Sequence, residues 1–328
     1  MDKRTLGKTG FSIGEVGLGC WQLGADWGND ITKDLAFSIL QEAVDNGVNF
    51  FDTADVYGEG KSEKFIGDYI KTNHLSLIVA TKFGRDKNTY PNNYTEETLR
   101  NSVNASLERL GLESLDLLQL HCIPINILKK GEIFNWLRTL KEEGLIKNFG
   151  ASVETVEEGL ICLEQEGLLS LQIIFNIFRQ KPLEELLPKA KSLGVGIIVR
   201  LPLASGLLSG KFTNKTQFTH NDHRCYNQNG ETFNVGETFA GLPFEKGVEL
   251  TDLIKNNFLP KDMSMVQLAL RWILDHEAVS CVIPGASSPS QVRSNAEVSY
   301  LGALPLHIHK ALSEFYTKEI HQNIRGNY

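Results

Sequence analysis

The sequence has 328 residues, of which 41% are hydrophobic and 22% are charged, and its formal net charge is −7 at pH 7. This composition is typical of a soluble globular protein, and the acidic balance argues against a nucleic-acid partner or an anionic membrane surface. No apolar run reaches the ~18–20 residues needed to cross a bilayer, and no signal-peptide core follows Met1. The five cysteines are scattered without a Cys-x-x-Cys motif, so we expect free thiols and a cytoplasmic protein.

Hydrophobic periodicity and turn residues predict a chain in which strands and helices alternate. Short strand-like runs at 4–6 and 11–13 flank two glycines and predict a β-hairpin that plugs one end of the fold. Eight further strands are predicted at 16–18, 49–52, 77–81, 115–120, 146–151, 171–175, 195–200 and 279–284. Helices are predicted at 32–46, 61–71, 95–110, 133–143, 156–166, 183–193, 243–257, 264–276 and 289–298, with an extra terminal helix at 305–320 and an irregular insertion at about 203–234.

Eight strands that are each followed by a helix predict a (β/α)8 barrel, and residues 1–328 fit one such domain. Active sites of these barrels lie at the carboxyl ends of the strands. A doubly wound sheet is the alternative, and it requires a Gly-x-Gly-x-x-Gly turn after an early strand. Neither the segment at 58–63 nor the segment at 17–22 has the third glycine, which favours the barrel.

Four ionisable residues lie at or just after the ends of three consecutive predicted strands, namely Asp52, Tyr57, Lys82 and His121. If the strands are parallel neighbours, the four side chains converge. An ammonium held by a carboxylate favours a phenolate, so we expect Lys82 to lower the pKa of Tyr57 below its usual value of ~10. Such a set can protonate a carbonyl oxygen while a hydride arrives at carbon. No side chain supplies a hydride, which indicates a nicotinamide cofactor.

The segments Phe51-Asp52-Thr53-Ala54 with Tyr57-Gly58, Thr81-Lys82 and Leu120-His121 resemble the aldo-keto reductase superfamily, and the resemblance extends from residue 17 to residue 287. It implies that the four residues form a catalytic tetrad with Tyr57 as the acid. The implied activity is NAD(P)H-dependent, reversible reduction of a small aldehyde or ketone. Potassium-channel β-subunits share these patterns, so a cofactor-binding regulatory subunit with little turnover is the alternative.

The resemblance also implies the residues that contact the cofactor. They are Gly19, Cys20 and Trp21 after the first strand; Ser152, Gln172 and Asn176 at the nicotinamide carboxamide; Arg200, Leu201, Pro202, Leu203, Ser205, Gly206, Ser209, Gly210 and Lys211 in the pyrophosphate loop; and Gly285, Ser287, Gln291 and Asn295 at the adenosine end. Val153 departs from the family's asparagine. Arg200 replaces an aromatic residue that stacks on the nicotinamide in the family, and we expect its guanidinium to stack there instead. The alternative interpretation is that Arg200 is a surface charge that points outward.

The 2′-phosphate of NADP is the remaining cofactor group to be assigned. The Lys-Ser pair of many NADPH-selective members is absent at 285–286, but Arg224 can approach this phosphate, so NADP(H) is favoured and NAD(H) is possible. The histidine pairs at 220 and 223 and at 307 and 309 do not supply three convergent ligands, so a metal-dependent hydrolase is disfavoured and no metal is expected. Loop residues Trp21, Trp27, Phe83, Tyr90 and Ile123 predict an apolar, aromatic substrate pocket. The oligomeric state is left open.

Overall fold

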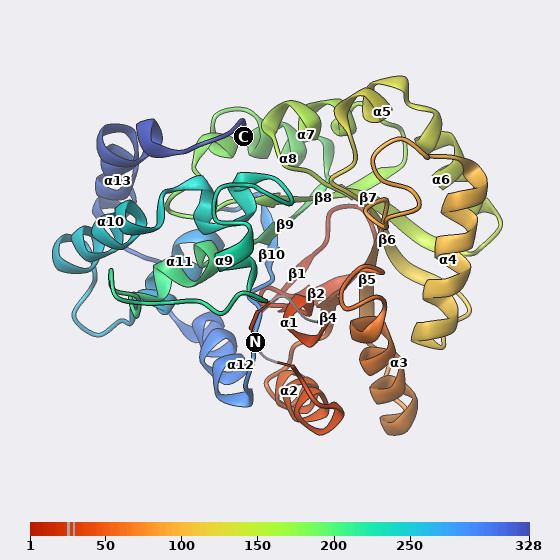
Figure 1. Ribbon diagram of the computed structural model, residues 1–328, viewed down its shortest axis with the longest axis horizontal. Coiled ribbons are helices and arrows are strands. Elements are labelled where there is room, and N and C mark those ends of the chain that lie inside the picture. Colours follow the sequence, from red (N-terminus) through yellow and green to blue (C-terminus); the bar gives the residue numbers. More distant parts are fainter. Residues whose placement is uncertain (25–26, 29) are drawn as a thin grey trace.

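The computed structural model describes residues 1–24, 27–28 and 30–328. Within these residues, eight strands form one sheet in the order β3 to β10, and every neighbouring pair is parallel (Figure 1). The strands are β3 (Leu18–Gly19), β4 (Phe50–Asp52), β5 (Ile78–Phe83), β6 (Leu115–His121), β7 (Ile146–Ser152), β8 (Leu168–Ile174), β9 (Gly196–Arg200) and β10 (Val279–Val282).

The sheet closes on itself through backbone contacts between its first and last strands. Gly17 N donates to Val282 O at 2.9 Å, and Gly19 N donates to Pro284 O at 3.1 Å. Isolated parallel bridges join Val16 to Val282 and Gly19 to Gly285. The predicted (β/α)8 barrel is therefore confirmed.

The predicted hairpin is also present, formed by β1 (Lys3–Thr5) and β2 (Ser12–Gly14), which pair antiparallel. The side chains of Leu6 and Ile13 are fully buried in an apolar cluster with strand residues that include Phe50 and Ile198, so the hairpin closes the bottom of the barrel. Gly7 has a φ of +50°, and a Cβ at this position would lie 2.3 Å from the backbone N of Gly196. This close approach requires glycine in the hairpin turn.

Helices surround the sheet, as Figure 1 shows. They are α1 (Trp21–Gly24), α2 (Lys33–Asp45), α3 (Lys61–Asn73), α4 (Glu96–Leu110), α5 (Ile125–Lys130), α6 (Glu132–Glu142), α7 (Val156–Leu163), α8 (Leu186–Leu193), α9 (His223–Tyr226), α10 (Phe244–Asn257), α11 (Met265–Leu274), α12 (Pro289–Ala296) and α13 (Leu306–Phe315). The short turns η1 (Lys181–Leu183), η2 (Ala204–Ser209), η3 (Val235–Glu237), η4 (Phe239–Gly241), η5 (Glu297–Tyr300), η6 (Tyr316–Ile320) and η7 (His321–Asn323) complete the description. No helix in the described part of the chain is long and apolar enough to cross a membrane.

Several predicted boundaries differ from the observed ones. The helix predicted from 183 begins at Leu186, because Glu185 has a φ of −139° that breaks the helical path after η1. The helix predicted at 305–320 is α-helical only to Phe315 and continues as the π-helical turn η6. The helix predicted at 95–110 begins with a capping box: the Thr95 hydroxyl accepts from Thr98 N, and the Thr98 hydroxyl accepts from Thr95 N, both at 3.1 Å.

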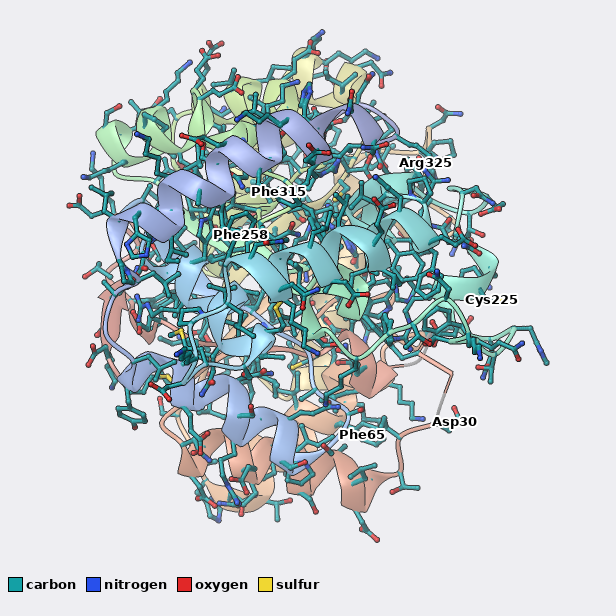
Figure 2. The ribbon with its side chains drawn as sticks, turned by 90° about the vertical axis from the view of Figure 1, so that its left-hand side faces the viewer. Asp30, Phe65, Cys225, Phe258, Phe315 and Arg325 are labelled. Carbon is teal, nitrogen blue, oxygen red and sulfur yellow. The ribbon has the colours of Figure 1, made fainter. Side chains whose placement is uncertain are left out.

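The terminal helix α13 lies along α10 on the outside of the barrel (Figure 2). Phe315 of α13 faces Phe258, which follows α10, with 5.3 Å between the ring centroids. Residues 324–326 then extend to the segment before α10, where the Arg325 side chain donates to Gly241 O at 2.9 Å. The extra helix therefore brings the end of the chain to the same loops that surround the upper end of the barrel.

Candidate active site

The parallel strands bring the four predicted tetrad residues together. Asp52 ends β4, His121 ends β6, Lys82 lies one residue before the end of β5, and Tyr57 follows in the turn after β4. The Lys82 ammonium is 1% exposed and donates to Asp52 Oδ1 at 2.5 Å, to Thr53 O at 2.7 Å and to the Tyr57 hydroxyl at 3.4 Å. The carboxylate thus holds the ammonium beside the phenol.

The pKa of Tyr57 differs from the expectation. Burial raises the pKa of Tyr57 to about 12, and Lys82, which acts to lower it, offsets only part of this effect. The expected net lowering is therefore wrong, because desolvation of the phenolate outweighs the neighbouring ammonium. Burial acts to lower the pKa of Lys82, but Asp52 and Tyr57 outweigh it and the pKa is raised. At neutral pH, Tyr57 carries its proton and Lys82 is charged.

His121 lies across from Tyr57, with 5.9 Å between the ring centroids and an angle of 83° between the rings. Burial, followed by the charges of Arg85, Lys82 and Arg200, holds the pKa of His121 well below its usual value. The imidazole is therefore neutral near pH 7. Its Nδ1 has no hydrogen-bond partner among the described residues.

A residue that the sequence reasoning missed, Gln119, completes the surroundings of Asp52. Gln119 Nε2 donates to Asp52 Oδ2 at 3.0 Å, and Gln172 Nε2 donates to the same oxygen at 2.7 Å. The sequence could have indicated this residue, because Gln119 precedes His121 by two residues in a strand and both side chains therefore point to the same face. A buried polar side chain on the inner face of a strand needs a hydrogen-bond partner, and here the partner is the tetrad carboxylate.

A cavity of about 530 Å³ opens above these residues and extends to α12, a volume within the usual range for ligand sites. Three of the tetrad residues line it, namely Asp52, Tyr57 and His121. The predicted cofactor residues that line it are Gly19, Cys20, Trp21, Gln172, Arg200, Leu201, Pro202, Leu203, Ser205, Gly206, Ser209, Lys211, Arg224, Gly285, Ser287, Gln291 and Asn295. Further lining residues that had not been predicted include Gln22, Phe212, Glu237, Ser290 and Ser294.

Three predicted cofactor residues lie outside this lining. Ser152 is buried and donates to Gln172 Oε1 at 3.4 Å, so it supports a lining residue. The Asn176 amide donates to Leu201 O at 2.9 Å and accepts from Phe178 N at 2.9 Å, which fixes the turn after β8. Gly210 follows η2 as its C-cap and has a φ of +68°. Ser152 and Asn176 therefore bond to residues that line the cavity.

The loop after β9 brings small residues and two cations to the cavity. Gly206 has a φ of +99°, and a Cβ at this position would lie 2.8 Å from the Phe212 ring and 3.7 Å from Arg224 Nη1. Asp222 holds the Arg224 guanidinium through bonds of 2.9 and 2.5 Å to Nε and Nη2. Lys211 is exposed beside it. Glycine backbone with nearby cations is a suitable environment for phosphate groups.

Arg200 points into the molecule rather than outward. Its side chain is 11% exposed, its Nη2 donates to Val153 O at 3.2 Å, and its Nη1 lies 3.6 Å from Glu237 Oε1. The alternative of an outward surface charge is therefore wrong. The Ser205 hydroxyl donates to Glu237 O at 3.1 Å and accepts from Phe239 N at 3.2 Å, so it links this loop to η3 and η4.

The two ends of the cavity differ in character. At the α12 end the lining consists of uncharged polar residues, among them Ser287 and Gln291, while Arg293 points away and pairs with Glu42 at 2.8 Å. At the tetrad end, Trp21 stacks on Tyr57 with 6.0 Å between centroids and contacts Trp27. The other residues expected in an aromatic pocket lie elsewhere: Phe83 and Ile123 are in the core, and Tyr90 is 49% exposed.

Comparison with known proteins gives consistent matches over nearly the whole chain. A model of the aldo/keto reductase family matches residues 15–316. The uncharacterized oxidoreductase YqkF of Bacillus subtilis (strain 168) is 32% identical over 335 aligned positions, covering 99% of this chain and 100% of that protein. The NADH-specific methylglyoxal reductase of Escherichia coli (strain K12) is 28% identical over 313 positions, covering 90% and 92%. The structure of the glycerol dehydrogenase AKR11B4 from Gluconobacter oxydans superimposes with a TM-score of 0.77 at 26% identity, covering 100% of this chain and 98% of that one.

Proposed function

Because the chain belongs to the aldo/keto reductase family, we propose that it reduces a small aldehyde or ketone to the alcohol, reversibly, with Tyr57 as the proton donor. The observation that carries this proposal is the chain of contacts from Asp52 through Lys82 to Tyr57 at the end of the cavity. The family uses nicotinamide cofactors, and a bound NAD(P)H supplies the hydride that no side chain can provide.

The residues of the cavity fit such a cofactor. The loop with Gly206, Ser209 and Lys211 offers small residues and positive charge for the pyrophosphate, and the turn before α12 offers polar groups for the adenosine. Gln172 and Arg200 would lie near the nicotinamide, where the amide of Gln172 is already fixed by Asp52. These assignments rest on which residues line one continuous cavity together with the tetrad.

Tyr57, Lys82 and His121 then have different roles at the carbonyl oxygen of the substrate. Tyr57 is protonated at neutral pH and gives its proton to this oxygen as the alcohol forms. Lys82 favours the phenolate that is left behind, which makes the proton easier to transfer. His121, held neutral, donates a hydrogen bond to the same oxygen and orients the substrate. In the reverse direction the phenolate takes the proton back.

The preferred cofactor is proposed to be NADP(H), with NAD(H) as the alternative. Arg224 supports NADP(H), because its Nε and Nη2 make the bonds to Asp222 while its Nη1 lies over the phosphate loop near Gly206. The uncharged lining at Ser287 and Gln291 supports NAD(H), since a 2′-phosphate at that end would find no cation among the described lining residues there. Arg293 offers none, because it is paired with Glu42.

A regulatory subunit with little turnover is not favoured, since the relatives reported above are oxidoreductases. Steady-state oxidation of NADPH and NADH with a panel of aldehydes tests the proposed function. Tyr57→Phe deletes one hydroxyl and keeps the ring, so we expect kcat to fall by ~10²-fold or more, the contribution of a general acid. Cofactor affinity, measured by fluorescence titration, should stay within about twofold. Reduction at the parental rate by the variant would show that Tyr57 is not the acid.

A further inference from the structure

Glu237 is a charged residue of the cavity that has no role in the reaction described above. It ends η3, in a segment between the irregular insertion and α10, and it lines the cavity together with Tyr57 and His121. Its side chain is 9% exposed. Since it belongs to the lining, this exposed part faces the cavity that also contains Tyr57 and His121.

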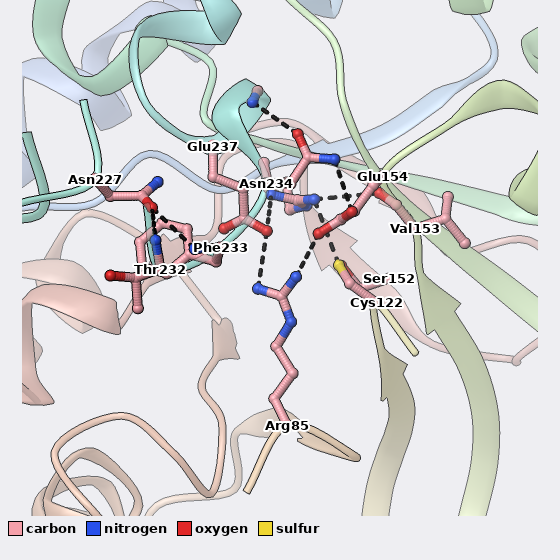
Figure 3. Close-up of polar contacts among 12 residues, drawn as sticks. Arg85, Cys122, Ser152, Val153, Glu154, Asn227, Thr232, Phe233, Asn234 and Glu237 are labelled. Atoms are coloured by element: carbon pink, nitrogen blue, oxygen red, sulfur yellow. Dashed lines mark hydrogen bonds and ion pairs between the residues drawn. The ribbon is translucent and has the colours of Figure 1, made fainter. Parts of the chain in front are cut away.

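Two arginines hold one oxygen of this carboxylate and leave the other available. Arg85 Nη1 lies 3.0 Å from Glu237 Oε1 (Figure 3). Arg200 Nη1 lies 3.6 Å from the same oxygen. Glu237 Oε2 has no hydrogen-bond or ion-pair partner among the residues that the structure describes. Burial acts to raise the pKa of Glu237, but the charges of Arg85 and Arg200 outweigh it and keep the pKa low. The free oxygen therefore belongs to an ionised carboxylate.

Glu154 is the matching carboxylate on the other side of Arg85. Arg85 Nη2 pairs with Glu154, and the Asn234 amide donates to Glu154 Oε2 at 2.8 Å (Figure 3). Glu154 does not belong to the described cavity lining. The ligand atoms of Cys122, Glu154 and Glu237 lie within 4.8 Å of one another, as at a metal site. Arg85 pairs with both carboxylates and Arg200 pairs with Glu237, so we interpret this cluster as an ion-pair network.

The backbone around Glu237 is fixed by contacts from distant parts of the chain. The Ser205 hydroxyl donates to the Glu237 carbonyl at 3.1 Å, and Arg325 donates to the carbonyls of Gly241 and Leu242 at 2.9 and 3.1 Å. A carboxylate held in place before binding loses little conformational freedom when a ligand arrives, which is the condition for selective recognition.

We propose that Glu237 determines substrate specificity: its free oxygen accepts a hydrogen bond from a hydroxyl group of the substrate, so the enzyme prefers hydroxylated aldehydes and ketones and disfavours those that carry a carboxylate. Hydrogen bonds to an ionised acceptor are about twice as strong as neutral ones. A like charge brought against Glu237 is repelled in the same space. This inference rests on the proposed function and deepens it by naming the substrate class.

Two matched pairs of aldehydes test the proposal through ratios of kcat/KM. D-glyceraldehyde and propanal differ by two hydroxyl groups on the same three carbons, and succinic semialdehyde and butanal differ by a carboxylate on the same four carbons. Glu237→Met removes the acceptor at similar length, and the glyceraldehyde-to-propanal ratio should fall about tenfold, as for loss of one hydrogen bond to a charged group. Glu237→Gln removes only the charge, and the succinic semialdehyde-to-butanal ratio should rise about tenfold.

Glu154→Met and Glu154→Gln are the control variants, because they change the same network outside the cavity lining. Both ratios should stay within about twofold of the parent in these variants.

The proposal is overturned if the ratios shift equally in the Glu154 and Glu237 variants, or if they do not change in the Glu237 variants. If Glu237→Gln binds NAD(P)H more weakly in a fluorescence titration while both ratios stay unchanged, Glu237 contacts the cofactor and not the substrate. This result also overturns the proposal. If Glu237→Met does not fold, the near-isosteric Gln variant decides. A parent that reduces none of the four aldehydes with either NADPH or NADH contradicts the proposed function itself.

Discussion

Replacing Lys82 by methionine, alone and together with Asp52→Asn, separates the effect of Lys82 on Tyr57 from its effect on the stability of the fold. The Lys82 ammonium contacts Asp52 Oδ1 at 2.5 Å, Thr53 O at 2.7 Å and the Tyr57 hydroxyl at 3.4 Å. In Lys82→Met the Asp52 carboxylate stays buried, at 2% exposure, without its countercharge. Breaking a buried ion pair in this way costs about 3–5 kcal/mol, so we expect a loss of this size in the free energy of unfolding.

The double variant Asp52→Asn with Lys82→Met removes both charges and should restore most of that stability. The amide oxygen of the introduced asparagine can still accept from Gln119 and Gln172, which donate to Asp52 Oδ2 at 3.0 and 2.7 Å in the parent. Replacing a whole buried ion pair by neutral groups is often close to neutral for stability. Catalysis should not recover, because Tyr57 still lacks the ammonium that favours its phenolate.

Urea unfolding and steady-state kinetics on the same preparations check both parts. We expect kcat to be at least ~10²-fold below the parent in the single and in the double variant, the range for impaired general acid catalysis. NAD(P)H affinity should change little in the single variant, because Lys82 does not line the described cavity. If the double variant recovers kcat together with stability, Lys82 only balances the charge of Asp52, and its proposed effect on Tyr57 is refuted.

Three further variants probe residues around the cavity. Arg200→Ala should weaken NAD(P)H binding more than it lowers kcat, and unchanged affinity in a fluorescence titration would contradict a position for Arg200 beside the nicotinamide. Arg224→Ala should reduce the NADPH-to-NADH ratio of kcat/KM; a constant ratio would show that Arg224 does not contact the 2′-phosphate. The depressed pKa of His121 gives stability that is present above pH 6.5 and is lost as the pH falls, since only the unfolded chain then binds the proton. We therefore expect the free energy of unfolding to fall less steeply between pH 7.5, 6.5 and 5.5 in His121→Gln than in the parent, by up to about 1.4 kcal/mol per pH unit, as measured by urea unfolding. The same pH dependence in both proteins would contradict this prediction.

The sequence predicted the barrel because alternation of short apolar runs with helical periods is a local property. It also predicted that Asp52, Lys82 and His121 would meet, since these residues lie at or near the ends of consecutive strands, and the carboxyl ends of neighbouring parallel strands share one edge. Caps such as Thr32, which accepts from Leu35 N at 3.3 Å, depend on residues three apart and were predictable for the same reason.

Burial and partners between distant segments were decided by the tertiary structure alone. The net rise in the pKa of Tyr57 reflects the depth at which the packed barrel and Trp21 enclose it, which no spacing along the chain encodes. Gln119 meets Gln172, and Glu237 meets Arg85, across 53 and 152 positions of sequence. Because hydrogen bonds and ion pairs of this kind act only over a few ångströms, their partners are set by how the strands and loops pack, and the sequence alone gives only the residue types that can take part.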